Sequence, residues 1–460
     1  MFSEDTIAAI ATPPGEGGIG IVRISGDKAL NIAREIFLFA GSKNETFKDR
    51  YLHYGKAVDG EGRIIDEVLL AYMKAPRSYT TEDVVEIHCH GGIIPVTNIL
   101  KEVIKKGARL AEPGEFTKRA FLNGRIDLVQ AEAVMDLISA KTQGLAKTSL
   151  MQMEGGLSGH IRSMREKLLG IMAHIEVTID YPEEDIDELA TQSILDDIVS
   201  ILKTIDYLLE TAEEGKLIRQ GIRAVIVGKT NVGKSSLLNA LVREERAIVT
   251  DIPGTTRDVI EEFINIKGVA VRIVDTAGIR ETLDQVEKIG IEKSKQNIER
   301  ADLIIVVLDA SSPLEDEDRQ ILNYIKDKKA LLILNKIDKP PLLNKKDIEE
   351  HLGREVPIVE SSLTLGKGID KIEEIIYKMF FRGEVEFSDG MMITNIRHQE
   401  ALIRANSCLT DALEGLDSQI PLDIVSIDLR GAVDSLGSIT GETVTEDLVN
   451  RIFSEFCLGK

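Results

Sequence analysis

Cysteine is scarce in this chain of 460 residues, which contains only Cys89, Cys408 and Cys457. An odd number of cysteines scattered over so long a chain excludes the dense disulfide framework of small secreted proteins. Cys457 stands near the end of the sequence, where a prenylated cysteine would stand, but Gly459 and Lys460 do not fit that signal. The cysteines therefore indicate neither disulfide cross-linking nor lipid attachment.

Long hydrophobic runs and an excess of positive charge are missing as well. No apolar stretch approaches the roughly 20 residues of a membrane-spanning helix. A signal peptide has a basic stretch before its apolar segment, and the short apolar segment near this N-terminus has none. We therefore expect a cytoplasmic protein with no membrane association. The formal net charge of -21 argues against nonspecific adhesion to nucleic acid, although a local basic patch is compatible with it.

What is present is a globular composition, with 43% hydrophobic and 29% charged residues, and a length typical of about three domains. Residues 1–123 mix strand-like runs at 19–24 and 83–87 with a helical segment at 95–106, which predicts an α+β domain. Residues 124–215 have helical periodicity, and residues 384–460 return to it, most clearly at 400–416 and 445–456.

Residues 216–383 have a different texture, in which apolar runs alternate with helical segments. The runs lie at 224–227, 271–274, 303–308, 331–334 and 358–359. Such alternation predicts a mostly parallel sheet with helices on both faces. We therefore expect a multidomain α/β protein in which this α/β domain is inserted into a discontinuous helical domain, whose two parts pack as one bundle.

A P-loop pattern, from Gly228 to Ser235, follows a predicted strand and precedes a predicted helix. In this context glycines let backbone amides surround phosphates, Lys234 supplies charge to the β and γ groups, and Ser235 offers a hydroxyl to Mg²⁺. The alternative is an ordinary glycine-rich turn.

Further elements follow in the order that a GTPase requires. A carboxylate and a glycine amide for the metal and γ-phosphate lie at 275–278, a switch threonine for Mg²⁺ lies at 255–256, and residues 361–363 would back the base. Asp338 can accept two hydrogen bonds from guanine N1 and N2, a donor pair that adenine lacks. The residues expected to bind GTP are Gly228, Asn231, Val232, Gly233, Lys234, Ser235, Ser236, Thr250, Asp251, Ile252, Pro253, Gly254, Thr255, Thr256, Asp275, Thr276, Ala277, Gly278, Asn335, Lys336, Asp338, Ser361, Ser362 and Leu363.

One position departs from Ras-like enzymes, where a glutamine after Asp-x-x-Gly orients the attacking water. Here that residue is Ile279, which has no side-chain hydrogen-bonding group. Either hydrolysis is slow, or water positioning and charge compensation come from elsewhere. Asn231, inside the P-loop, could help to hold a monovalent cation that does the electrostatic work of an arginine finger.

With these motifs assembled, the chain resembles bacterial tRNA-modifying GTPases of the MnmE (TrmE) family in all its regions. The resemblance is carried by Thr12–Gly15 with Gly17–Gly26, Tyr79–Glu86, Pro113–Thr117 with Arg119–Asn123, and Phe456–Lys460. It implies a folate-binding-like N-terminal domain that forms a homodimer, a discontinuous helical domain and an inserted G domain that pairs face to face when GTP and K⁺ are bound. It also implies joint action with the FAD-dependent partner MnmG (GidA) on the wobble uridine of certain tRNAs, at C5, to give carboxymethylaminomethyl or aminomethyl uridine.

The resemblance also assigns residues by motif position. Asn231, Thr250, Ile252 and Thr255 would surround K⁺, Ser235 and Thr256 would bind Mg²⁺, and Glu287 would orient the attacking water. The catalytic residues implied are thus Glu287, Asn231 and Lys234; without the resemblance, Glu287 would be interpreted as a solvated carboxylate at a helix start.

Arg23, Glu86, Arg125 and Lys460 would bind 5-formyltetrahydrofolate or a related one-carbon folate, with a carboxylate on the pterin's donor edge and cations on the folate glutamate. As alternatives, Arg23 could be a surface strand residue and Lys460 a frayed terminus.

Two other functions compete with this one. The chain could be a regulatory G protein, for example one in ribosome assembly, whose product is a conformational state. It could also be a folate-dependent one-carbon transferase that works without nucleotide. Loss of the modified wobble uridine on deletion would favour tRNA modification over the regulatory G protein. One-carbon transfer without nucleotide would favour the one-carbon transferase.

Overall fold

The computed structural model describes residues 5–41, 46–180, 188–244, 262–274, 298–381 and 391–460. The chain divides into two compact units, each assembled from segments that are distant in sequence. The first consists of Met1–Met135, Gln152–Val177 and Leu429–Lys460, and the second of Asp136–Met151 and Thr178–Asp428.

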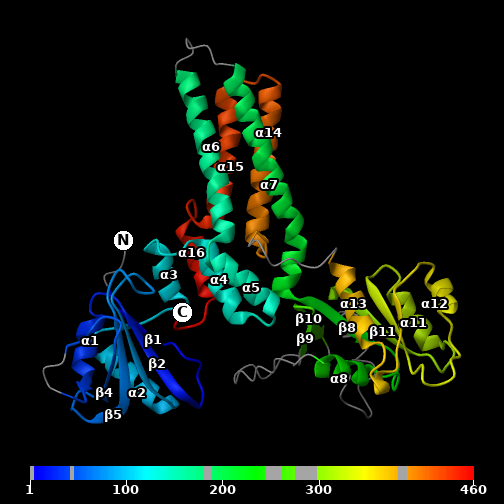
Figure 1. Cartoon of the computed structure of the whole chain (residues 1–460), viewed down its shortest axis with the longest axis horizontal. Coiled ribbons are helices and arrows are strands. Elements are labelled where there is room, and N and C mark those ends of the chain that lie inside the picture. Colours follow the sequence, from blue (N-terminus) through cyan, green and yellow to red (C-terminus); the bar gives the residue numbers. More distant parts are fainter. Residues whose placement is uncertain (1–4, 42–45, 181–187, 245–261, 275–297, 382–390) are drawn as a thin grey trace. The chain divides into compact units, whose positions relative to one another are not determined.

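The first unit contains an N-terminal sheet with the strand order β3-β4-β5-β6-β2-β1-β7 (Figure 1). Neighbouring strands are antiparallel except for β1 and β7, which are parallel. The strands are β1 (Ile7–Ile10), β2 (Gly17–Ser25), β3 (Phe37–Phe39), β4 (Leu52–Val58), β5 (Ile64–Met73), β6 (Val84–Gly91) and β7 (Arg109–Leu110).

Helices α1 (Ala29–Ile36) and α2 (Ile93–Lys105) pack against this sheet, and their apolar residues form one core with the alternate residues of the strands. The expected strands at 19–24 and 83–87 correspond to β2 and β6, and the expected helix at 95–106 corresponds to α2. Helix α3 (Glu115–Leu122) follows and packs against α16 (Glu446–Ser454), so the end of the sequence folds with its beginning.

The helical region has the bounds α4 (Leu128–Ser139), α5 (Gln143–Met153), α6 (Gly156–Asp180), α7 (Glu188–Gln220), α14 (Ile396–Asp417) and α15 (Leu422–Thr440). Within the second unit, α7 and α14 lie side by side (Figure 1), and Asn406 Nδ2 donates to Asp206 Oδ1 at 2.7 Å. Segments from before and after the α/β domain are thereby packed together. Helix α7 continues through the expected boundary at 215/216 and ends at Gln220, directly before the central sheet; the boundary at 383/384 lies outside the described residues.

The second unit contains a sheet with the order β13-β12-β11-β8-β10-β9, parallel except for β9 against β10. Its strands are β8 (Ile222–Val227), β9 (Glu262–Ile266), β10 (Val269–Val274), β11 (Leu303–Asp309), β12 (Ala330–Asn335) and β13 (Ile358–Glu360). Its helices are α8 (Lys234–Glu244), α11 (Asp316–Tyr324), α12 (Lys345–Leu352), the short η1 (Leu363–Leu365) and α13 (Ile369–Phe380).

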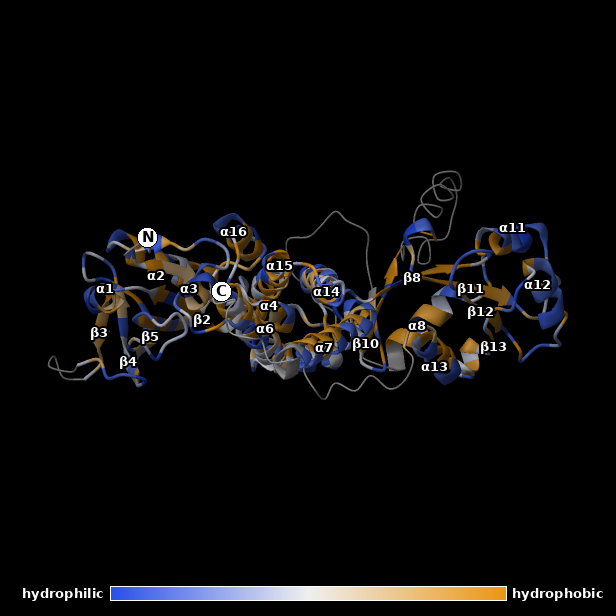
Figure 2. Cartoon of the chain, turned by 90° about the horizontal axis from the view of Figure 1, so that it is seen from above, coloured by the Kyte–Doolittle hydropathy of each residue, from blue (hydrophilic) through white to orange (hydrophobic). Residues whose placement is uncertain are grey.

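Strand β11 shows why this region has uninterrupted apolar runs. Leu303 and Ile305 belong to the core on one face of the sheet, and Ile304 and Val306 belong to the core on the other. Helices cover both faces, and Figure 2 shows the outer helices α11 and α12 largely hydrophilic. The multidomain α/β architecture expected from the sequence is confirmed, including the mostly parallel sheet.

Candidate functional site

The loop after β8 has a path that requires glycine. Gly228 has φ +152°, and a Cβ on it would lie 2.4 Å from the backbone oxygen of Val307. Gly233 has φ +113°, and a Cβ there would lie 2.2 Å from Nδ2 of Asn335. A side chain at either position would collide with these neighbours, so the path of the loop requires glycine at 228 and 233.

Lys234 begins helix α8 and folds back over the loop. Its Nζ donates to the carbonyl oxygens of Gly228 at 2.6 Å and Lys229 at 2.7 Å. Burial lowers the pKa of Lys234. A partly buried ammonium at a helix N-terminus, with Ser235 and Ser236 next to it in the first turn of the helix, is suited to bind an anion.

Sequence reasoning missed the partners of Lys229, the second residue of this loop. Its Nζ lies 2.7 Å from Asp318 Oδ2 and 2.9 Å from Glu315 Oε2. Both acids belong to the capping box at the start of α11. These ion pairs connect the phosphate loop to helix α11. The partners are more than 80 positions apart, so no local sequence pattern predicts the contact.

Asn335 joins the phosphate loop to the segment after β13. Its buried side chain donates from Nδ2 to the backbone oxygen of Val232 at 2.8 Å, and its Oδ1 accepts from the backbone amide of Leu363 at 3.1 Å. The side-chain amide of Asn335 therefore connects the two loops.

Asp338 is an exposed carboxylate at this end of the sheet. Its Oδ1 accepts a hydrogen bond from Oγ of Ser362 at 2.6 Å, which holds the pKa of Asp338 below its ordinary value. The group is thus ionised at neutral pH and fixed in direction, while it stays accessible. These are the properties needed to accept hydrogen bonds from a base.

Lys336 precedes Asp338 in a left-handed conformation, with φ +67°. Its Nζ lies 2.5 Å from Oδ2 of Asp309, at the end of β11. Although burial alone would raise the pKa of Asp309, hydrogen bonds from Lys336 and Ser311 hold it below its ordinary value. Loops after β8, β12 and β13 thus converge at the carboxyl ends of parallel strands, where ligands of open α/β sheets bind.

The remaining residues expected at this site lie outside the described residues. They are Thr250, Asp251, Ile252, Pro253, Gly254, Thr255, Thr256, Asp275, Thr276, Ala277, Gly278 and Glu287.

A second cluster lies in the N-terminal domain, around Arg23. Register pairs Arg23 on β2 with Glu86 on β6, and Arg23 Nε lies 2.8 Å from Glu86 Oε1. His88 follows Glu86 on the same strand face, with Nε2 3.4 Å from Glu86 Oε2, so strand alternation could have revealed this contact. The hydrogen bond from His88, and then the charge of Arg23, hold the pKa of Glu86 below its ordinary value against the effect of burial. The pairing therefore stabilises the fold at neutral pH and is lost as the pH falls through this lowered pKa.

Aromatic rings and the end of the sequence surround Arg23. Its guanidinium carbon lies 5.6 Å from the ring centre of Phe116 and 5.8 Å from that of Tyr79. NH1 of Arg23 donates to the backbone oxygen of Gly459 at 3.3 Å. The guanidinium carbon of Arg125 lies 4.8 Å from the ring centre of Tyr79.

Lys460 reaches the same neighbourhood, because its backbone oxygen accepts from the amide of Phe116 at 3.2 Å. The structure thus brings Arg23 and Glu86 into direct contact, places Arg125 over the ring of Tyr79, and places the backbone of Lys460 against that of Phe116. Sequence reasoning assigned no role to Tyr79, although it stands in one of the motifs that carry the resemblance.

No group of three or more His, Cys, Asp or Glu side chains is arranged to hold a metal ion within the described ranges. No helix in the part of the chain that the structure describes is both long enough and apolar enough to cross a membrane.

A glycine-dependent P-loop with a partly buried lysine, together with a fixed and accessible carboxylate at the same end of the sheet, indicates the class of the protein. It is a P-loop GTPase. Comparison with known proteins gives the family. Residues 6–125 match the family described as GTP-binding protein TrmE N-terminus, and residues 128–457 match the MnmE helical domain.

The relatives include two curated proteins described as tRNA modification GTPase MnmE. The one from Alkaliphilus oremlandii is 52% identical over 462 residues, and the one from Clostridioides difficile is 54% identical over 461 residues. In both cases the alignment covers 100% of this chain and of the relative. The chain belongs to the MnmE family of tRNA modification GTPases.

Among solved structures, the G domain of the FeoB iron transporter of T. maritima is 26% identical, with a TM-score of 0.27, over 34% of this chain and 98% of that one.

Proposed function

We propose that this GTPase acts in the cytoplasm as a homodimer and, together with an FAD-dependent partner of the MnmG type, installs a carboxymethylaminomethyl or aminomethyl group at C5 of the wobble uridine in tRNA. The observation that supports this most is the match over the full length. It extends through the N-terminal and helical regions, which a regulatory G protein with no modification chemistry would not need.

The described residues of the G domain suit a Mg²⁺-bound guanine nucleotide. Gly228, Gly233 and Lys234 would hold the phosphates, Ser235 with Thr256 would bind Mg²⁺, and Asp338 would read guanine. The metal ion neutralises charge that develops on the phosphates. Asn231, Thr250, Ile252 and Thr255 would hold a K⁺ ion that does the work of an arginine finger, and Glu287 would orient the attacking water.

The N-terminal cluster suits a one-carbon folate such as 5-formyltetrahydrofolate. Glu86 is held as a carboxylate, which can accept hydrogen bonds from the donor edge of a pterin, and Tyr79 offers an aromatic face beside it. Arg23, Arg125 and Lys460 supply positive charge for the carboxylates of the folate glutamate.

The function is tested by mass spectrometry of tRNA from cells that lack this protein. We expect the wobble uridines of the substrate tRNAs to lose the C5 substituent, and the gene encoding this chain to restore it. Intact modification together with a defect in ribosomal subunits would instead support the regulatory G protein.

Replacing Arg23 by alanine is expected to weaken folate binding on the order of tenfold or more, because Glu86 loses its guanidinium partner and the folate loses a charged donor. GTP turnover should not change, because Arg23 lies in the other unit of the chain. Titration calorimetry with 5-formyltetrahydrofolate measures the first effect, and phosphate release measures the second.

The matched control is Lys105→Ala, which removes an exposed lysine from its ion pair with the buried Glu102 elsewhere in the same domain and should leave folate affinity unchanged. An Arg23→Ala protein with wild-type folate affinity would refute the folate site at this cluster.

A further inference from the structure

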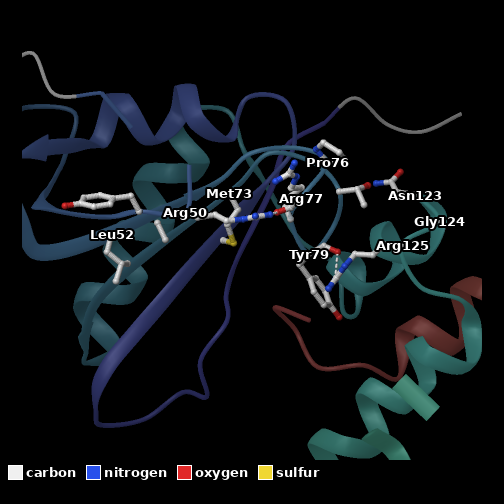
Figure 3. Close-up of a pocket in the computed structure, with 13 residues that line it drawn as sticks. Arg50, Leu52, Met73, Pro76, Arg77, Tyr79, Asn123, Gly124 and Arg125 are labelled. Carbon is white, nitrogen blue, oxygen red and sulfur yellow. Dashed lines mark hydrogen bonds between the residues drawn. The ribbon is translucent and has the colours of Figure 1, made fainter. Parts of the chain in front are cut away.

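A wide depression of about 740 Å³ lies in the N-terminal domain, next to the cluster around Arg23. Tyr51, Tyr79 and three arginines, Arg50, Arg77 and Arg125, are among its lining residues (Figure 3). The volume lies within the range of small-molecule sites, roughly 300–1,000 Å³. We call this feature the arginine depression.

The arginine depression is basic, whereas the chain as a whole is acidic. The whole sequence has 77 acidic and 56 basic residues, yet the described residues that line the depression include no carboxylate. In the described part of the chain, the hydrogen bonds of these guanidinium groups go to backbone oxygens: Arg50 donates to that of Arg77 at 2.5 Å, and Arg125 to that of Tyr79 at 2.8 Å. A guanidinium group that has no carboxylate partner can form a bidentate bond with a carboxylate from a ligand.

The arginine depression is continuous with the proposed folate cluster. Tyr79 lines the depression and is also the ring that lies against Arg23, while Arg125 lines it and lies over the same ring. Figure 3 shows Tyr79 and Arg125 together at one end, with Arg77 and Arg50 farther along. A ligand whose pterin is held by Glu86 could therefore extend past Tyr79 toward Arg77.

We propose that the arginine depression binds the oligo-γ-glutamate tail of a folate, with Arg77 and Arg50 as the residues that contact carboxylates beyond the first glutamate. Folates occur with one or several γ-linked glutamates, and each further glutamate adds one carboxylate. A row of carboxylates matches several arginines that line one concave surface. The proposal rests on the proposed folate site and specifies its ligand as a polyglutamylated form.

RNA phosphates also bind arginines, and the family acts on tRNA, so nucleic acid is the competing ligand. An RNA surface would be expected to continue as a basic stripe across the domain. Here the arginines line one depression, and acids lie close to its edge: Asp49 accepts from the backbone amide of Lys74, and Asp83 from that of Ala75. A short oligoglutamate tail therefore matches this small group of arginines better than an RNA backbone does.

The test compares 5-formyltetrahydrofolate carrying one glutamate with the form carrying five, by calorimetry on the full-length protein. We expect the wild type to bind the pentaglutamate on the order of tenfold tighter, in keeping with one or two added charged hydrogen bonds. The double variant Arg50→Gln, Arg77→Gln should bind both forms equally, with the monoglutamate affinity unchanged. Arg63→Gln, which removes an exposed arginine paired with Asp59 and Glu61 in the same domain, should keep the tenfold ratio.

Arg50 has a left-handed backbone, with φ +56°, so Arg77→Gln alone is measured too, in case the double variant melts early. Equal affinity of the wild type for both folates would overturn the proposal while leaving the folate site intact. An unchanged ratio in the variants, with reduced affinity for tRNA, would assign the arginine depression to nucleic acid. Failure of the wild type to bind either folate would reject the folate site itself, and this proposal with it.

Discussion

Replacing Asp338 by asparagine is expected to lower the affinity for GTP on the order of 10³-fold and to make xanthosine triphosphate the better ligand. The carboxylate can accept from both guanine N1 and the exocyclic N2, whereas an asparagine amide presents one acceptor and one donor. Xanthine has an oxygen where guanine has the amino group, so the new donor has a partner there. A site built on hydrogen bonds discriminates strongly when one partner is changed.

The structure adds a reason for the size of this effect. Ser362 donates to Asp338 and keeps it ionised, so the base meets a charged acceptor with a fixed direction. Nucleotide exchange with fluorescent GTP and xanthosine triphosphate analogues would measure the preference. Asp347→Asn, at an exposed position in the first turn of α12, is the control and should change neither affinity. Unchanged guanine selectivity in the Asp338 variant would move base recognition to another residue.

GTP hydrolysis is expected to be at least about tenfold faster in KCl than in NaCl at equal ionic strength. An arginine finger contributes about 10³–10⁵ in rate, and the proposed K⁺ ion would supply part of that charge compensation. Phosphate release in the two salts, with Mg²⁺ and nucleotide saturating, measures the difference. Equal rates would defeat the cation proposal.

Asn231 allows this prediction to be separated from a backbone effect. Its φ is +61°, a conformation that glycine and asparagine tolerate best, so the residue has a structural explanation that involves no cation. Asn231→Gly keeps that backbone and removes the side-chain oxygen, and should abolish the difference between KCl and NaCl while nucleotide affinity is kept. Asn231→Asp retains an oxygen ligand and should preserve stimulation by K⁺. If the glycine variant stayed K⁺-dependent, the carboxamide of Asn231 would have no part in the cation site.

The parts of the fold that could be predicted are those with a strong local pattern. The run of apolar residues at 303–308 indicated a strand buried on both faces, and β11 is such a strand. The sequence reasoning did not identify strands β4 and β5, which take their place in the sheet by pairing with each other and, for β5, with β6. The change of texture at residue 216 reflects composition, whereas helix α7 continues to Gln220, and Gly215 within it lies against the backbone of Ile393.

The candidate sites divide in the same way. The phosphate loop is a continuous segment, so its residue types and spacing predict its chemistry, and the structure adds the collisions that require glycine at 228 and 233. The contact of Lys229 with Asp318 joins segments without any shared pattern and could not be read from the sequence. The convergence of Arg23, Glu86 and the end of the sequence followed only from the family resemblance. Contacts between distant strands, and between a strand and the end of the sequence, depend on the tertiary fold.

The hydrogen bond from Arg23 to Gly459 also sets an order of events during synthesis. The two residues are separated by 436 positions. At a translation rate of about 5–20 residues per second, the ribosome adds Gly459 roughly 20–90 seconds after Arg23. The N-terminal sheet can pair before that point, but the cluster around Arg23 stays incomplete until Gly459 has been added. Incomplete polypeptides would therefore lack the hydrogen bond between Arg23 and Gly459.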